Sequence, residues 1–288
     1  MSAEREHPQL SPIHLVPIVI CLLASYLFTS LIVISRLSLP PPVITPVQEP
    51  PPTVPAEEAL SQPAPYINSL MIIFIMFAAG VVIIYILAKY RRLLKFIIYF
   101  LIGLVTFSTT AFYTSLIAFV FTPWILELWL FFTAGAIFFV IYSIHKGYET
   151  LAMLSAVYVA SSAGSITGSS LPFWTSIVLM VAVSLYDVYI VYRGYLKNLT
   201  KEDALTFPGL MVEFKGITVG LGDFFFYSIL SSFALSSWGL ISALMAGVGI
   251  ILGFTLTIYL LRYRRILPGL PLSLIIGLSL ALLGSIIF

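Results

Sequence analysis

This chain carries too few charged residues to cover a surface that faces water. Charged residues make up 9% of its 288 residues, whereas a soluble domain carries roughly 25%. Apolar residues account for 60% of the chain, and the mean hydropathy is +1.08. The apolar residues gather in runs long enough to cross a bilayer as helices, which takes about 20 residues each. We therefore expect an all-α polytopic membrane protein.

Nine such runs are present, and together they predict one membrane domain over residues 1–288. They lie near 13–35, 66–88, 96–119, 124–144, 150–168, 172–192, 217–236, 239–261 and 268–287. The fifth run is rich in serine and glycine. Small residues let helices approach closely, so we expect this helix to pack inside the bundle. Gly249 and Gly253 form a G-x-x-x-G face that predicts close packing of the eighth.

The basic residues predict the orientation of these helices. All of the 14 lysines and arginines except Arg36 lie before the first run or in alternate connections. Positive residues favour the cytoplasmic side of a membrane. We therefore expect a cytoplasmic N-terminus and, after nine crossings, an exterior C-terminus. The expected location is the cell membrane, as a multi-pass integral protein in contact with the lipid bilayer.

Two connections and one cysteine complete this outline. Ten of the 26 residues in 40–65 are proline, which predicts an extended, semi-rigid exterior linker exposed to solvent. Residues 193–216 form a cytoplasmic connection. The single cysteine, Cys21, excludes an internal disulfide and a site with several thiolate ligands. No basic patch with interleaved aromatic residues supports binding of nucleic acid.

Only two of the 12 acidic residues, Asp187 and Asp223, lie inside apolar runs rather than in a connection or near the end of a run. An ionisable group in hydrocarbon costs several kcal/mol, so it usually has a function. Asp187 precedes Arg193 by six residues, and Asp223 follows Lys215 by eight. At 1.5 Å per helical residue, both would lie roughly 9–12 Å below the cytoplasmic boundary. The sixth and seventh helices can pack as antiparallel neighbours, which would let the carboxyl groups meet.

Two carboxyl groups that meet in a medium of low dielectric constant cannot both stay ionised, so the pair shares one proton. The ionised member can act as general base on a water molecule held between them. The protonated member can donate to the carbonyl oxygen of an amide. This chemistry needs no metal or organic cofactor. The pair therefore predicts an aspartyl protease that works within the bilayer, with either aspartate as the base.

The residues around the two acids suit that task. Gly220, Leu221 and Gly222 precede Asp223, and the two glycines remove bulk so that a partner backbone can approach the carboxyl group. Tyr186 precedes Asp187 and offers a hydroxyl group near the predicted site. Pro268, Gly269 and Leu270 open the ninth run on the same side. We expect the prolines there to leave backbone groups free to pair with an extended peptide.

Three motifs together resemble the presenilins, within the wider GxGD intramembrane aspartyl proteases that include signal peptide peptidase. They are the Tyr186-Asp187 pair, the Gly-Leu-Gly-Asp motif continuing to Ser228, and the Leu-Pro-Gly-Leu-Pro-Leu-Ser sequence over 267–273. The nine-helix layout also matches that family. The small size and short connections are most similar to archaeal presenilin homologues.

The resemblance implies that Asp187 and Asp223 are the catalytic pair. It further implies that Pro268, Gly269 and Leu270 correspond to the Pro-Ala-Leu motif, which shapes the site and helps to hold substrate. Here glycine replaces the alanine, which preserves the backbone contacts and adds flexibility. The expected partners are transmembrane substrate proteins. The sequence is compatible with a homo-oligomer and requires no helper subunit.

Other classes of function have less support. The sequence contains neither H-E-x-x-H nor G-x-S-x-G, and its three histidines lie at the edges of the apolar runs, which argues against zinc and serine proteases. A proton-coupled transporter or channel is the main alternative, since intramembrane acids also form proton relays. Transporters usually show paired halves, whereas the special motifs here cluster in the last third. A structural scaffold would give no reason to bury two acids.

Overall fold

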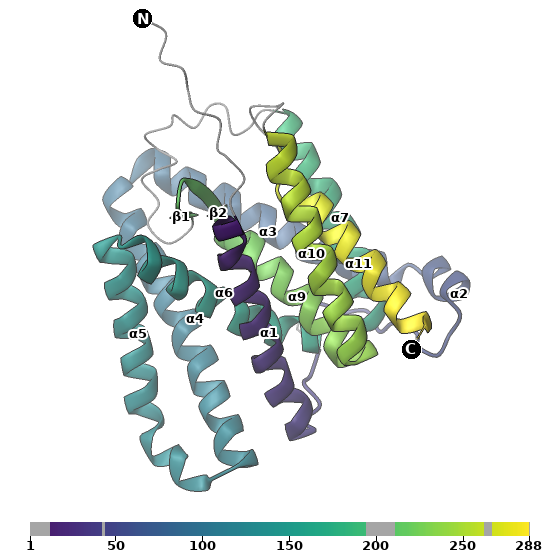
Figure 1. The fold of residues 1–288 in the computed structure, drawn as a ribbon, viewed down its shortest axis with the longest axis horizontal. Helices are drawn as coiled ribbons and strands as arrows, with labels where there is room; N and C mark the ends of the chain where they lie inside the picture. The colour runs from purple at the N-terminus through teal and green to yellow at the C-terminus, as the bar shows by residue number, and fades with distance from the viewer. Residues whose placement is uncertain (1–11, 42–43, 194–210, 262–266, 288) are drawn as a thin grey trace, which may run out of the picture.

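The computed structural model describes residues 12–41, 44–193, 211–261 and 267–287, and these residues form a helical bundle with one short β-hairpin (Figure 1). In chain order the elements are η1 (Pro12–Leu15), α1 (Val16–Ser35), α2 (Ala56–Ser61), α3 (Ala64–Lys89), α4 (Arg91–Val120), η2 (Pro123–Leu128), α5 (Trp129–Lys146), α6 (Glu149–Ser170), α7 (Phe173–Arg193), β1 (Met211–Phe214), β2 (Ile217–Gly220), α9 (Leu221–Trp238), α10 (Leu240–Leu261) and α11 (Leu270–Ile287).

Within these described ranges, eight helices are long and apolar enough to cross a membrane. They confirm the prediction of a multi-pass, all-α membrane protein. Helix α9 is not among the eight, so the predicted count of nine crossings stays a prediction, as does the orientation. The 18 residues of helix α9 include Asp223 and five serines, which lower its hydropathy.

Helix α9 lies in the interior of the bundle, where protein surrounds it. It contacts α1, α6, α7, α10 and α11, and nearly every residue from Phe224 to Ala234 is buried. Figure 1 shows α4 and α5 on one side of the molecule and α7, α10 and α11 on the other. A polar helix is tolerated at membrane depth when protein rather than lipid faces it. The position of α9 therefore explains how this chain keeps an acid there.

Close packing against α6 holds α9 in this interior position. A Cβ atom on Gly164 of α6 would lie 2.5 Å from Ser228 Cβ and 2.9 Å from the carbonyl oxygen of Phe225. Only glycine permits this approach. The expectation that α6 packs inside the bundle is confirmed, because 61% of the residues in its most apolar stretch are buried.

The G-x-x-x-G face of α10 also packs as predicted. A Cβ atom on Gly249 would lie 2.7 Å from Gly277 Cα of α11, and one on Gly253 would lie 2.5 Å from Ser273 Cα. Helices α10 and α11 are therefore in backbone contact. This contact positions the beginning of α11, where the Pro-Gly-Leu motif lies.

Hydroxyl groups of α1, α6 and α9 form hydrogen bonds with one another in the centre of the bundle. The Ser25 hydroxyl lies 2.8 Å from the hydroxyl oxygens of both Ser231 and Ser232. Thr29 donates to Ser232 at 2.7 Å, and Ser232 donates to Ser165 at 3.1 Å. All five side chains are fully buried. Because an unpaired polar group in an apolar interior costs free energy, this network favours one arrangement of the three helices.

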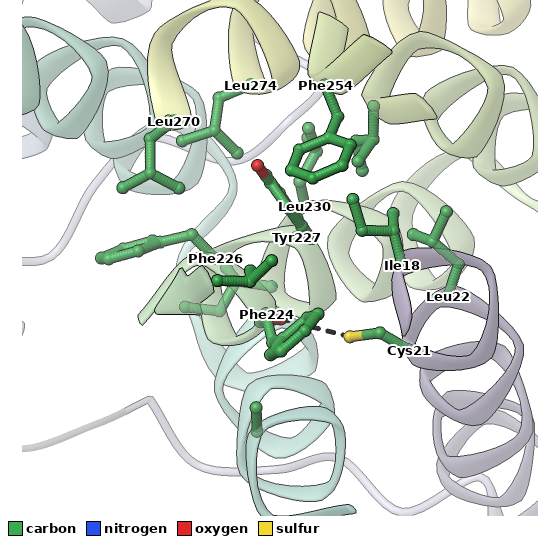
Figure 2. Close-up of a cluster of buried hydrophobic side chains, with 14 of the residues drawn as sticks. Ile18, Cys21, Leu22, Phe224, Phe226, Tyr227, Leu230, Phe254, Leu270 and Leu274 are labelled. Atoms are coloured by element: carbon green, nitrogen blue, oxygen red, sulfur yellow. Dashed lines mark hydrogen bonds between the residues drawn. The ribbon is translucent and has the colours of Figure 1, made fainter. Parts of the chain in front are cut away.

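An apolar cluster surrounds the start of α9. Phe224 and Tyr227 are fully buried there, together with Ile18 and Cys21 of α1 (Figure 2). The Cys21 thiol donates to the carbonyl oxygen of Phe224 at 3.5 Å. Helix α1 therefore packs directly behind the turn of α9 that carries Asp223.

The proline-rich connection is largely exposed, but it is not simply extended as we predicted. It contains helix α2, and the Glu49 carboxylate accepts hydrogen bonds from the backbone N–H groups of Trp174 and Thr175 at 2.7 and 2.9 Å. The Thr175 hydroxyl adds a third bond at 2.8 Å. Asn68 of α3 bonds both backbone groups of Val47. The first N–H groups of a helix lack partners within the helix, and a negative charge there is favourable. This connection therefore anchors the beginning of α7.

Loss of the Glu49 carboxylate should destabilise the protein. We expect Glu49→Ala to lower the free energy of unfolding by about 2 kcal/mol, because a helix loses its capping acceptor. Glu49→Gln keeps one acceptor oxygen and should lower the free energy of unfolding by less. The measurement is thermal unfolding in detergent. Glu127→Ala is the matched control, since it removes the same charge from an exposed position outside the first turn of a helix. Equal shifts for Glu49→Ala and Glu127→Ala would contradict this assignment.

Candidate active site

Asp187 lies near the end of its helix, whereas Asp223 lies at the beginning of its helix. Asp187 lies six residues before the C-terminal end of α7 at Arg193. Asp223 lies in the first turn of α9, at its third residue. The sequence predicted a helix over 217–236, with Asp223 well inside it. That boundary is wrong, because the backbone is extended up to Gly220.

The residues before α9 form a β-hairpin that the sequence analysis missed. Strand β1 pairs antiparallel with β2, and Phe214 lies opposite Ile217. The two residues between the strands, Lys215 and Gly216, have φ angles of 51° and 84°. Positive φ at both turn residues is typical of a two-residue hairpin turn. The β-branched residues at 217–219 were the available signal, since they favour strand over helix.

The Asp223 carboxyl group lies between two backbone segments. Its Oδ2 atom accepts a hydrogen bond from the backbone N–H of Gly220 at 3.4 Å, which caps the beginning of α9. The same oxygen lies 3.3 Å from the position that a Cβ atom on Gly269 would occupy. The absence of a side chain at Gly269 therefore gives the Asp223 carboxyl group its space.

The Asp187 carboxyl group contacts the next residue of that second segment. Its Oδ2 atom accepts a hydrogen bond from the backbone N–H of Leu270 at 3.1 Å. Two carboxyl groups from different helices thus contact adjacent residues, Gly269 and Leu270.

The Pro-Gly-Leu segment joins the two acids at the beginning of α11. Pro268 and Gly269 are non-helical and precede the helix, which begins at Leu270 rather than at residue 268 as predicted. Leu270 is buried. Proline has no backbone N–H and fixes φ, which makes the approach to the helix rigid. The structure therefore brings Pro268, Gly269 and Leu270 to the same place as Asp187 and Asp223.

The other predicted site residues have less direct contact with the acids. Gly220 ends β2, and Leu221 and Gly222 form the first residues of α9. Among the residues that the structure describes, no atom outside the neighbouring backbone lies within 4 Å of a Cβ position on Gly222, which is exposed. Tyr186 is half-buried and makes no hydrogen bond to either carboxyl group in the part of the chain that the structure describes.

Two further residues lie beside this segment, Tyr227 and Ser273, and no role was predicted for either side chain. The Tyr227 hydroxyl lies 3.4 Å from the carbonyl oxygen of Gly269 and 3.2 Å from the Ser273 hydroxyl oxygen. Helical spacing was the available signal, since Tyr227 follows Asp223 by four residues and faces the same way. Its partner lies 42 residues away along the chain, so no local pattern could have predicted the contact.

The described residues contain no group of three or more His, Cys, Asp or Glu side chains that could hold a metal ion. The polar groups at the site are instead two carboxyl groups, one tyrosine hydroxyl and several backbone amides. Such a set can hold water and share a proton.

Comparison of the sequence with known families identifies the C-terminal third of this chain. Residues 197–288 match the Presenilin family model. Presenilin-B of Dictyostelium discoideum is 36% identical over 126 residues, which cover 40% of this chain and 26% of that protein. The presenilin homologue of Drosophila melanogaster is 43% identical over 67 residues, which cover 23% of this chain and 12% of that protein. The match thus spans about a quarter or less of these relatives.

The fold is similar to a solved structure over nearly its whole length. The structure of a presenilin family intramembrane aspartate protease superposes with a TM-score of 0.60 and covers 95% of this chain and 99% of that one, at 18% identity. At this identity the likeness shows the fold alone. Together with the sequence match, it confirms the predicted resemblance to the presenilin family.

The space at Gly269 can be tested by substitution. A methyl group there would press on the Asp223 carboxyl group, which is the end of a side chain and can move by a few tenths of an ångström. We therefore expect Gly269→Ala to unfold at nearly the same temperature and Gly269→Val to unfold earlier, because overpacking costs about 1–3 kcal/mol. Gly222→Val, at an open position, is the matched control for thermal unfolding. A Gly269→Val protein as stable as Gly222→Val would mean that Asp223 does not lie against Gly269.

Proposed function

We propose that this presenilin-like chain is an intramembrane aspartyl endopeptidase, which hydrolyses peptide bonds in or near the transmembrane helices of substrate proteins. One observation carries the proposal. Asp187 and Asp223, from two different helices, contact adjacent residues of one segment at the beginning of α11. The solved structure with the similar fold is described as such a protease.

The proposed mechanism uses the carboxyl pair with one shared proton. The ionised carboxylate removes a proton from a water molecule as that water attacks the carbonyl carbon of the substrate amide. The protonated partner donates to the carbonyl oxygen and forms a tetrahedral intermediate. The carboxyl group that took the proton from water then gives it to the amide nitrogen. As the C–N bond breaks, the other carboxylate takes a proton from a hydroxyl group of the intermediate, which leaves a carboxylic acid product and restores the shared proton. Either aspartate can take either role.

Backbone groups hold the pair in place. Gly220 donates to Asp223, and Leu270 donates to Asp187. An N–H donor orients a carboxylate and offsets part of its charge without adding a cation. Both of these bonds end on the Oδ2 atom of the acid, and we propose that Oδ1 of each acid meets water and substrate.

The proposed substrate segment must leave its helical conformation before it is cut. A helical amide is shielded by its own hydrogen bond and by neighbouring turns. Weak helix formers near the cut, such as glycine or β-branched residues, should therefore favour cleavage. Strand β2 ends three residues before Asp223, and in the described chain its sheet has only two strands. An extended segment could add to that edge, beside the open side of Gly222.

The proposed partners are single-span and multi-span membrane proteins, presented through the bilayer. We further propose the cell membrane as the location. A homo-oligomer is compatible with this function, and helper subunits are not required for two aspartates on one chain to act together.

Replacement of either aspartate by asparagine should abolish cleavage. We expect Asp187→Asn and Asp223→Asn each to lower kcat by at least about 100-fold, because the general acid–base pair is lost. An amide oxygen can still accept the backbone bonds, so both variants should fold. The measurement is cleavage of a purified single-span substrate, with glycine or valine near its centre, in detergent and in lipid vesicles.

The matched control is Glu127→Gln, an equivalent change at an exposed position in η2. It should cleave at the wild-type rate. Substantial turnover by either aspartate variant would reject the shared-proton mechanism. A wild-type protein that transports protons across vesicles and never cleaves would favour the transporter instead.

The rate of cleavage should depend on pH with a single maximum. In acid both carboxyl groups are protonated, and no general base is left. In alkali both are ionised, and no group can donate to the carbonyl oxygen. We therefore expect kcat to fall on both sides, as is usual for a dyad with two apparent pKa values. Thermal unfolding measured over the same range separates this effect from loss of fold. A flat profile would be evidence against the pair.

A further inference from the structure

Tyr227 links α9, the helix that carries Asp223, to the Pro-Gly-Leu segment that contacts both acids. It is fully buried, and it follows Asp223 by one helical turn on α9. Its ring packs among Phe254, Leu270 and Leu274, and its oxygen points toward α11 (Figure 2). The hydroxyl has one hydrogen, which can be donated to the carbonyl oxygen of Gly269 or to the hydroxyl oxygen of Ser273.

The contact with Gly269 involves the same peptide unit that bonds Asp187. The carbonyl oxygen of Gly269 and the N–H of Leu270 lie at opposite ends of one planar amide. The oxygen end faces the Tyr227 hydroxyl at 3.4 Å, and the N–H end donates to Asp187 Oδ2 at 3.1 Å. Rotation of this peptide plane would break both bonds at once. A hydrogen bond at the carbonyl also strengthens the N–H as a donor.

The peptide needs such a restraint because of its sequence. Gly269 has no Cβ atom and therefore has more backbone freedom than any other residue. An alanine there would restrict the peptide but would press on Asp223. Glycine at position 269 thus leaves room for the Asp223 carboxyl group. It also leaves the Gly269–Leu270 peptide, which bonds Asp187, freer to rotate.

We propose that Tyr227 is a positioning residue, whose hydroxyl holds the Gly269–Leu270 peptide with its N–H directed at Asp187. This inference rests on the proposed function. If Tyr227 served only for packing, its ring would be enough without the hydroxyl group. If the hydroxyl group only needed a hydrogen-bond partner, Ser273 would be enough.

The test is Tyr227→Phe, which keeps the ring and removes the oxygen. We expect kcat to fall about tenfold, which is the effect of one lost hydrogen bond, with KM changed less than twofold. Amide hydrogen exchange should rise in the segment 267–271. Since Pro268 and Pro271 have no amide hydrogen, this segment reports only on Leu267, Gly269 and Leu270. The unfolding temperature should change little.

Tyr113→Phe is the matched control. Tyr113 is a buried tyrosine on α4 whose hydroxyl donates to the carbonyl oxygen of Ser162 at 3.2 Å. Its loss should leave kcat and the exchange of 267–271 unchanged.

The outcomes separate this inference from the proposed function. A wild-type protein that cleaves, with a Tyr227→Phe variant of equal kcat and equal exchange at 267–271, overturns the role of Tyr227 alone. A Tyr227→Phe variant that unfolds, or exchanges faster throughout its helices, assigns the hydroxyl to the fold and also overturns the inference. A wild-type protein that never cleaves overturns the proposed function, whereas local exchange still tests the contact.

Discussion

The arrangement of this protein depends on placing a polar helix in the centre of an apolar bundle. Helix α9 carries an acid and five serines, and facing lipid these groups would be costly. Its hydroxyl groups are paired with those of α1 and α6, and Gly164 lets α6 approach its backbone. Because the buried serines near the centre of α9 find partners inside the protein, this part of the helix can stay enclosed. The neighbouring helices α1, α6, α7, α10 and α11 provide the surroundings.

Once α9 is enclosed, the site forms where three chain segments meet at its beginning. Strand β2 supplies Gly220, whose N–H donates to Asp223. Helix α7 supplies Asp187, and the residues at the beginning of α11 contact both acids. Contact between α10 and α11 fixes where those residues lie. At the far end of α7, Glu49 anchors the same helix that carries Asp187. The acids are therefore positioned from several directions, and each contact uses backbone groups as much as side chains.

The predicted and observed secondary structures differ most just before Asp223. The apolar run 217–236 predicted a helix, and most of it is one. Its first four residues form β2, since a hairpin turn at Lys215 and Gly216 pairs them with 211–214. Hydropathy does not distinguish a short buried strand from the first turn of a helix. The linker shows a similar limit, because its composition gave no sign that Glu49 would cap a helix 125 residues away.

The sequence by itself determined the class of the protein, the approximate extent of its membrane helices and the two acids most in need of explanation. These follow from local properties: the length of apolar runs, the scarcity of charge and the cost of a carboxyl group in hydrocarbon. Only the tertiary structure decided which backbone groups meet those acids. The bond from Leu270 to Asp187 and the contact of Tyr227 with Gly269 join residues 83 and 42 positions apart. Such contacts depend on how helices pack, and packing is a property of the whole chain.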